Sequence, residues 1–343
     1  MKHAIAALAF CLALPPTLAA GGETPAVPDS WNSQINADHP LVGTLKRVRD
    51  GADVSPGQLA DAIADARFVL VGETHNNPDH HALQAWIVRT LAARGRRPAV
   101  AFEMLDADQA GPLEDYLATN PETAAGLGEA VNWGERGWPA WSMYQPIADA
   151  ALAAGMPLRT ADVAPDTQRH VGRKGFDGAV SPEARERLAL ATPLGKKARE
   201  RLIADLVAGH CDMLPESAMA PMARVQRLRD AVMADNLIRA SEESGNGAVL
   251  IAGRGHVRAD RAVPWYLRQR LDDPSVVTIG IVEAFADRRE WRAYLPESPE
   301  TGPPPFDFLW VTPRYDDTDH CAELRKKMQQ GHGDGGMGMG TGN

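Results

Sequence analysis

Short apolar runs alternate with helix-forming stretches along most of the chain. The stretch 78–95 indicates a helix, because Asn77 can cap it, Pro78 suits its first position and Gly95 suits its end. The apolar runs predict buried strands at 67–73, 98–104, 157–163, 247–253, 275–283 and 306–312. Strands that alternate with helices predict an α/β fold, with a mostly parallel sheet flanked by helices on both faces.

One segment, at about 165–220, breaks this alternation. It is charged, has a helical pattern and contains no strand-like run, so we expect a helical insertion or lid. We therefore predict one α/β domain over 43–325 that carries this insertion. Residues 21–42 are predicted to form a loose lead-in, and the Gly- and Met-rich tail, 326–343, is predicted to be disordered.

The N-terminus has the pattern of a secretory signal peptide over residues 1–20. A basic start and an apolar run are followed by small residues, and Thr17 and Ala19 form one acceptable cleavage pair. We therefore expect a periplasmic or secreted protein. A lipid anchor on Cys11 is less favoured, because the bulky Phe10 precedes it. No later apolar run reaches the roughly 18–20 residues that a membrane helix needs.

Charge and cysteine content narrow the function further. The net charge of −9 argues against nucleic acid as a partner, because phosphate binding needs a basic surface. Removal of the signal leaves Cys211 and Cys321, each preceded by a histidine. In an oxidising compartment we favour a disulfide between them over a free-thiol or metal site.

Ligand-type side chains gather where the predicted strands end. Glu73 and His75 follow the first apolar run, and Glu103 follows the second. His256 comes three residues after Gly253, so that "GETH" and "GRGH" share the form Gly-x-x-His after a strand. The carboxyl ends of parallel strands form one edge, where ligands bind. We therefore expect a common site, rather than separate hydrogen-bonded structural histidines.

The neighbouring helices add further candidates. His80 and His81 lie in the first turn of the helix after the first strand and point back to the same rim. Arg229 falls within the apolar stripe of a long helix at about 218–243, where it must be paired. Its partner is either an acidic residue of the sheet or an anionic ligand.

The segment 132–146 is rich in tryptophan. It forms either a hydrophobic plug over the sheet edge or a wall for a flat apolar ligand, and Tyr144 stands beside it.

Together these motifs resemble a known family. "LVGETHNNPDHH", the glutamate of "AFEM", "WSMYQPI", "HCDMLPESAM", "VQRLRDAVMADNL", "AGRGHVR" and "DFLWVTP" occur in the order of the ChaN-like haem-binding uptake family of the Tiki superfamily. The resemblance covers about residues 45–321. It implies an exported protein that binds haem, often at a homodimer interface, and takes part in iron acquisition.

The resemblance also implies roles for particular residues. Tyr144 would ligate the haem iron, and His80, His81 or Arg229 would meet the propionates. Covalent attachment is excluded, because the chain has no Cys-x-x-Cys-His.

Relatives in the superfamily are metal-dependent proteases or esterases. The matching set here is Glu73, His75, Glu103 and His256, with a divalent metal ion held by His75, Glu103 and His256. Such an ion would lower the pKa of a bound water and make it a nucleophile. Haem binding is our leading hypothesis. A metal-dependent hydrolase is the alternative, and a binding module with a relic site is a third and weaker one.

Overall fold

Residues 22–297 and 302–331 are described by the computed structural model. The predicted signal peptide and residues 332–343 of the predicted tail lie outside these ranges. The strands are β1 (Leu45–Arg47), β2 (Ala52–Asp53), β3 (Phe68–Glu73), β4 (Ala99–Asp106), β5 (Leu158–Asp162), β6 (Ala248–Gly253), β7 (Val276–Glu283) and β8 (Phe308–Thr312). They form one sheet in the order β2-β1-β8-β7-β3-β6-β4-β5.

The pairing confirms the mostly parallel sheet. Strands β8, β7, β3, β6, β4 and β5 pair in parallel, and among the named strands antiparallel pairing is confined to the short β1, which lies between β8 and β2. The six predicted strands all occur. The structure adds β1 and β2, which are too short to give a periodic signal in the sequence.

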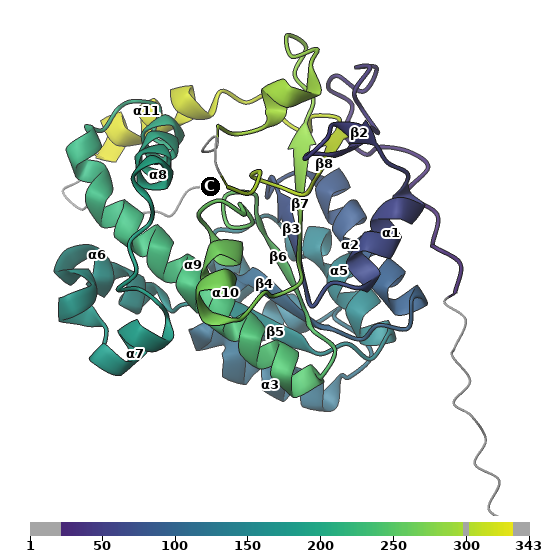
Figure 1. Cartoon of the computed structure of the whole chain (residues 1–343), viewed down its shortest axis with the longest axis horizontal. Coiled ribbons are helices and arrows are strands. Elements are labelled where there is room, and N and C mark those ends of the chain that lie inside the picture. The colour runs from purple at the N-terminus through teal and green to yellow at the C-terminus, as the bar shows by residue number, and fades with distance from the viewer. Residues whose placement is uncertain (1–21, 298–301, 332–343) are drawn as a thin grey trace, which may run out of the picture.

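The helices cover both faces of the sheet (Figure 1). They are α1 (Pro56–Ala64), α2 (Pro78–Ala93), α3 (Ala110–Thr119), α4 (Leu127–Ala130), α5 (Trp141–Ala153), α6 (Pro165–Ala179), α7 (Pro182–Arg187), α8 (Lys196–Gly209), α9 (Glu216–Ser244), α10 (Val263–Arg270) and α11 (His320–Gly331). Three 3₁₀ turns are η1 (Ala107–Gln109), η2 (Trp133–Glu135) and η3 (Trp291–Tyr294). No helix in the described ranges combines the length and hydrophobicity needed to cross a membrane.

Alternate side chains of the central strands pack into two separate hydrophobic cores, one on each face of the sheet. In β3, Val69 and Val71 pack with α1, α2 and α5, whereas Phe68 and Leu70 pack with α9 and α10. Successive side chains of a strand point to opposite faces, which explains the division. All six residues of β3 are buried, as expected for a strand covered on both sides.

The predicted insertion is helical. Helices α6, α7 and α8 precede the long α9 and lie to one side of the sheet (Figure 1). A small third core, which includes Leu202 and Met219, joins α8 to α9. A disulfide between Cys211 and Cys321 links the turn after α8 to α11 and confirms the expected bond. In the chain-entropy model, a loop of this size stabilises the fold by about 4–5 kcal/mol.

The lead-in is attached rather than loose. The Gly22 amide donates to the Ala93 carbonyl at 2.8 Å, and Trp86 Nε1 donates to the Pro25 carbonyl at 2.9 Å. These contacts fix the lead-in along α2. At the other end of the chain, α11 extends to Gly331, so residues 326–331 are helical.

Candidate functional site

The two Gly-x-x-His turns begin side by side at the carboxyl edge of the sheet. Strands β3 and β6 pair in parallel, with Glu73 opposite Gly253. The next helix after β3 starts as the sequence predicts, because the Asn77 side chain accepts from the amides of Asp79 and His80. The strand ends therefore bring both motifs to one place, as expected from the topology.

Each motif requires its glycine because the other motif lies against it. A Cβ on Gly72 would lie 2.4 Å from Val257 Cγ2 and 2.9 Å from the Arg254 Cα of the second turn. A Cβ on Gly253 would lie 2.8 Å from His75 Nε2 of the first turn. Both spaces are too small for any larger residue, so the glycines allow the two turns to interlock.

The Glu103 carboxylate lies between the two motif histidines. Its Oε1 accepts from Arg229 Nη2 at 2.7 Å and lies 3.2 Å from His256 Nε2. Its Oε2 accepts from the Gly253 amide at 2.6 Å and lies 4.0 Å from His75 Nε2. The expected meeting of His75, His256 and Glu103 is therefore present in the structure.

The His256 ring is held between two acids. Its Nδ1 lies 2.7 Å from Asp230 Oδ1, on the side opposite Glu103. Burial lowers the pKa of His256, but Glu103 and Asp230 outweigh this effect and raise it to about 9. The imidazole is therefore protonated at neutral pH. The same ion pairing holds the pKa of Glu103 well below its usual value, although burial opposes it.

A second cluster forms around Glu73. Its Oε1 accepts from the Tyr144 hydroxyl at 2.9 Å and lies 2.8 Å from His75 Nδ1, and its Oε2 lies 3.0 Å from His81 Nδ1. Burial raises the pKa of Glu73, but the two histidines outweigh it, so the net shift is downward. Burial lowers the pKa of His81, but Glu73 reverses that effect and raises it overall.

The residues expected to meet haem are already engaged with protein groups. Arg229 Nε donates to Asp162 Oδ2 at 2.8 Å, in addition to its bond with Glu103, so it is a buried salt bridge between α9 and the sheet. His80 is fully buried and accepts from the Thr74 amide at Nδ1. Its pKa is lowered by burial, so it stays neutral. For these residues, contact with a ligand stays a prediction.

Tyr144 is likewise enclosed. Its side chain is 0% exposed, and burial together with Glu73 raises the pKa of its hydroxyl well above 10. Trp133 and Trp141 pack against each other with ring centroids 4.8 Å apart, as a plug would. Trp138 differs, because its ring lies 4.9 Å from that of His75 at the rim.

The expected divalent-metal site at His75, Glu103 and His256 is not supported. No group of three or more His, Cys, Asp or Glu residues in the described ranges has the arrangement of a metal site. The donor set explains this result. Glu103 already accepts from Arg229 and Gly253, and protonated His256 has no lone pair to offer.

Two acidic members of this network were not among the predicted site residues. Asp230 orients His256 and Asp162 pairs with Arg229. The sequence contained a partial signal for Asp230, because it lies at the edge of the apolar stripe of the long helix. For Asp162 the sequence contained no signal beyond its position at the end of a predicted strand.

Comparison with known proteins identifies the family of this chain. A family model described as haem-binding uptake, Tiki superfamily, ChaN matches residues 59–267, which is more than half of the chain. The chain belongs to this family.

One solved structure, from the same family, shares the fold. ChaN of Campylobacter jejuni, described with cofacial haem binding, has a TM-score of 0.56 and 16% identity, and the match covers 78% of this chain and 95% of that one. The type III effector HopBA1 has a TM-score of 0.39 and 13% identity, with coverage of 80% and 98%. A mutant of the erythromycin esterase EreC gives 0.34 and 14%, with coverage of 66% and 71%. No curated protein matched the sequence.

The charge of His256 makes the stability of this ChaN-family chain depend on pH. The unfolded imidazole has its ordinary pKa of 6.5 and the folded one a pKa of about 9. The stabilisation is therefore complete below pH 6.5 and is lost as the pH rises through 9. It amounts to at most about 3 kcal/mol. His81 contributes with the same sign. The depressed pKa values of Glu73 and Glu103 do not change the slope in this window.

Urea unfolding between the two ends of this pH window measures the effect. We expect the free energy of unfolding to fall with rising pH in the wild type, and to fall much less in His256→Gln. His170→Gln, at an exposed position on α6, is the matched control and should keep the wild-type slope. A wild-type stability that does not change with pH would contradict the charge assigned to His256.

Proposed function

We propose that this protein is an exported haem-binding protein that serves haem or iron acquisition. The observation that carries this conclusion is membership of the haem-binding uptake family, with the match centred on the α/β domain. The related ChaN of Campylobacter jejuni is described as binding haem cofacially. Haem is the cargo in this proposal, and the chain must supply an accessible iron ligand and an apolar surface for the porphyrin.

Tyr144 does not offer an accessible ligand in this structure. Its ring is buried, and its hydroxyl proton is donated to Glu73. A ligand at this position would require the phenol to leave Glu73 and reach the surface. A tyrosine that could ligate iron is therefore present at the rim, but haem iron cannot reach its hydroxyl in this structure.

His210, at the end of α8, fits the requirement better. Its Nδ1 lies 2.7 Å from the Leu206 carbonyl, to which it donates, so Nε2 keeps a lone pair on a partly exposed ring. A metal-binding imidazole usually has its other nitrogen fixed in this way. Leu206, Val207 and Leu214, which lie within four residues of His210 in the sequence, are apolar and only partly buried. The disulfide at the next residue, Cys211, attaches this part of the insertion to α11.

Glu73, His75, Glu103 and His256, with the groups they pair with, form what we call the strand-end network. This network favours binding rather than hydrolysis as the function. An acid–base residue must exchange its proton near the working pH. The pKa of His256 is raised to about 9, the pKa values of Glu73 and Glu103 are held below their usual range, and each of the three is paired with neighbouring protein groups. We therefore assign this network to the stability of the strand ends and do not propose the hydrolase.

Titration with hemin tests the proposal. We expect the Soret band of hemin to shift when it binds the wild type. In His210→Ala, which lacks the proposed iron ligand, we expect an affinity at least about tenfold weaker, a loss of about 1.4 kcal/mol or more. In Tyr144→Phe we expect little change in affinity. His170→Ala is the control for an exposed histidine on the same insertion. Light scattering of the same samples reports whether haem joins two copies.

Each outcome of this titration is informative. A wild type that binds no hemin would contradict the proposed function. If Tyr144→Phe loses binding and His210→Ala keeps it, haem binding stands and the ligand is the tyrosine.

We also propose that the chain is exported. The N-terminal pattern and the Cys211–Cys321 disulfide support this, because disulfides persist in oxidising compartments. Expression of the full chain in a Gram-negative host, followed by fractionation and intact mass under non-reducing conditions, checks it. We expect a periplasmic product that has lost the signal peptide and contains no free thiol. A cytoplasmic product that keeps Met1, or a lipid on Cys11, would contradict this.

A further inference from the structure

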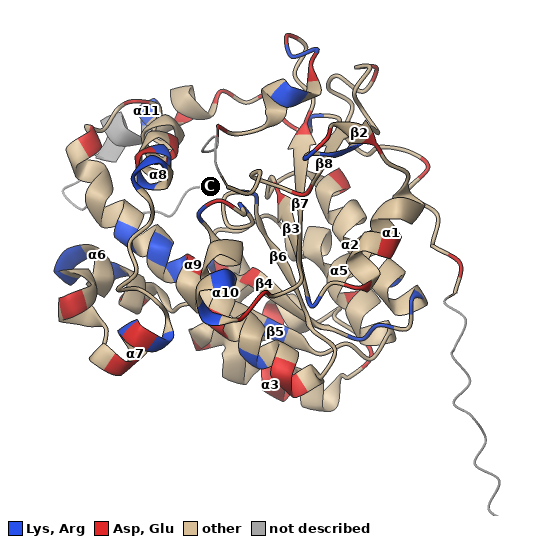
Figure 2. Ribbon diagram, viewed as in Figure 1, with Lys and Arg blue, Asp and Glu red and all other residues tan. Residues whose placement is uncertain are grey.

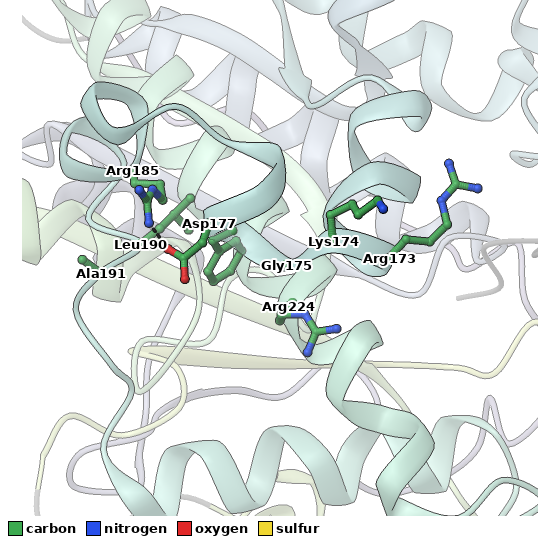
Figure 3. A pocket seen from close by; sticks show the side chains of 9 residues that line it. Arg173, Lys174, Gly175, Asp177, Arg185, Leu190, Ala191 and Arg224 are labelled. Carbon is green, nitrogen blue, oxygen red and sulfur yellow. Dashed lines mark hydrogen bonds and ion pairs between the residues drawn. The ribbon is translucent and has the colours of Figure 1, made fainter.

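A hollow of about 600 Å³ lies between the helices of the insertion and α9 (Figure 3), and none of the residues that line it belongs to the strand-end network. Its walls come from α6, from α7 and the residues after it, and from the first half of α9. It is lined by Arg173, Lys174, Gly175, Phe176, Asp177, Arg185, Leu190, Ala191 and Arg224. This volume is in the range of small-molecule sites.

The lining of the hollow is strongly basic. Four of its side chains are cationic and one is acidic, although the chain as a whole has a net charge of −9. Arg185 pairs with the single acid, Asp177 (Figure 3). Within the described ranges, Arg173, Lys174 and Arg224 form no salt bridge. Figure 2 shows both signs of charge along the insertion helices, so this local excess is a feature of the hollow. Like charges in a concave surface attract counter-ions.

Two guanidinium groups in the wall each have one buried nitrogen without an acceptor. Arg224 Nη2 donates to the Gly172 carbonyl at 3.1 Å, which fixes the side chain, but its buried Nε has no partner. The buried Nε of Arg185 also has none. Gly175 breaks the helix with φ of +70°, and a Cβ built on it would lie 4.0 Å from Arg224 Nε. Buried donors without acceptors are rare in native proteins, and an anion would satisfy these.

An apolar surface accompanies these charges. Phe176 and Leu190 form part of the wall, and Arg227 stacks over the Phe176 ring with its guanidinium carbon 5.5 Å from the centroid. A hollow that combines unpaired guanidinium groups with an aromatic ring matches an organic anion better than a simple inorganic one.

We propose that this hollow binds a small organic anion that carries at least two carboxylate or phosphate groups. Arg224 would hold one group, and Arg173 and Lys174 at the mouth would hold another, with the apolar body against Phe176. This site is separate from the haem function and does not depend on it. It also differs from the strand-end network, where Arg229 on the same helix is already neutralised by Glu103 and Asp162.

Calorimetry of the full mature chain with two aromatic probes, benzene-1,3-dicarboxylate and 1,3-phenylene bisphosphate, tests the proposal at low ionic strength. We expect at least one probe to bind with one-to-one stoichiometry, and the preferred probe identifies the anionic group. Arg224→Gln should weaken binding by about tenfold or more, and Lys174→Gln by several-fold. Lys174 is exposed, so its substitution tests the site even if Arg224→Gln does not fold.

The control is Arg199→Gln, which removes the same charge from an exposed position on α8 outside the hollow. It should bind the probes as the wild type does. Binding of neither probe would overturn the proposal, as would an equal loss in the control, because that would indicate only non-specific charge attraction. Hemin titration of Lys174→Gln should match the wild type, which keeps this result distinguishable from a failure of haem binding.

Discussion

The buried carboxylate of Glu103 is the interaction on which the strand ends depend. It receives bonds from Arg229 on α9 and from the Gly253 amide, and it lies beside protonated His256. A buried charge is tolerated only when it is paired and hydrogen-bonded, and removal of one partner from such a pair typically costs about 3–5 kcal/mol. Glu103 therefore fastens the long helix and both glycine turns to the same edge of the sheet.

Because of this constraint, we propose that ligands bind away from the paired Gly-x-x-His motifs. The strand-end acids and bases neutralise one another and leave few free lone pairs. The accessible chemistry lies instead in the helical insertion, at the partly exposed His210 and in the basic hollow beside Arg224. The α/β domain provides the rigid frame, and the insertion provides exposed polar groups, held to the C-terminal segment by the Cys211–Cys321 disulfide.

Much of the frame could be predicted from the sequence, because it depends on local signals. Apolar runs predicted the strands, and two of these runs lead into Gly-x-x-His motifs. The parallel topology then placed His75 and His256 at one edge. The partners of buried charges could not be predicted in the same way. The apolar periodicity showed that Arg229 lies in an apolar stripe and needs an acidic partner. The two acids that pair with it, Glu103 and Asp162, lie far from it in the sequence, so no local pattern identifies them. Tyr144 looked available for a ligand because no local pattern reveals that its hydroxyl bonds to Glu73.

The titration of the His256 ring, followed by NMR in the wild type and in Glu103→Gln, tests the central claim most directly. We expect the ring to titrate near pH 9 in the wild type. We expect a clear fall in that pKa when the charge of Glu103 is removed, because Glu103 is one of the two acids that oppose the effect of burial. A wild-type ring that titrates at or below 6.5, or one that is unchanged in Glu103→Gln, would contradict it.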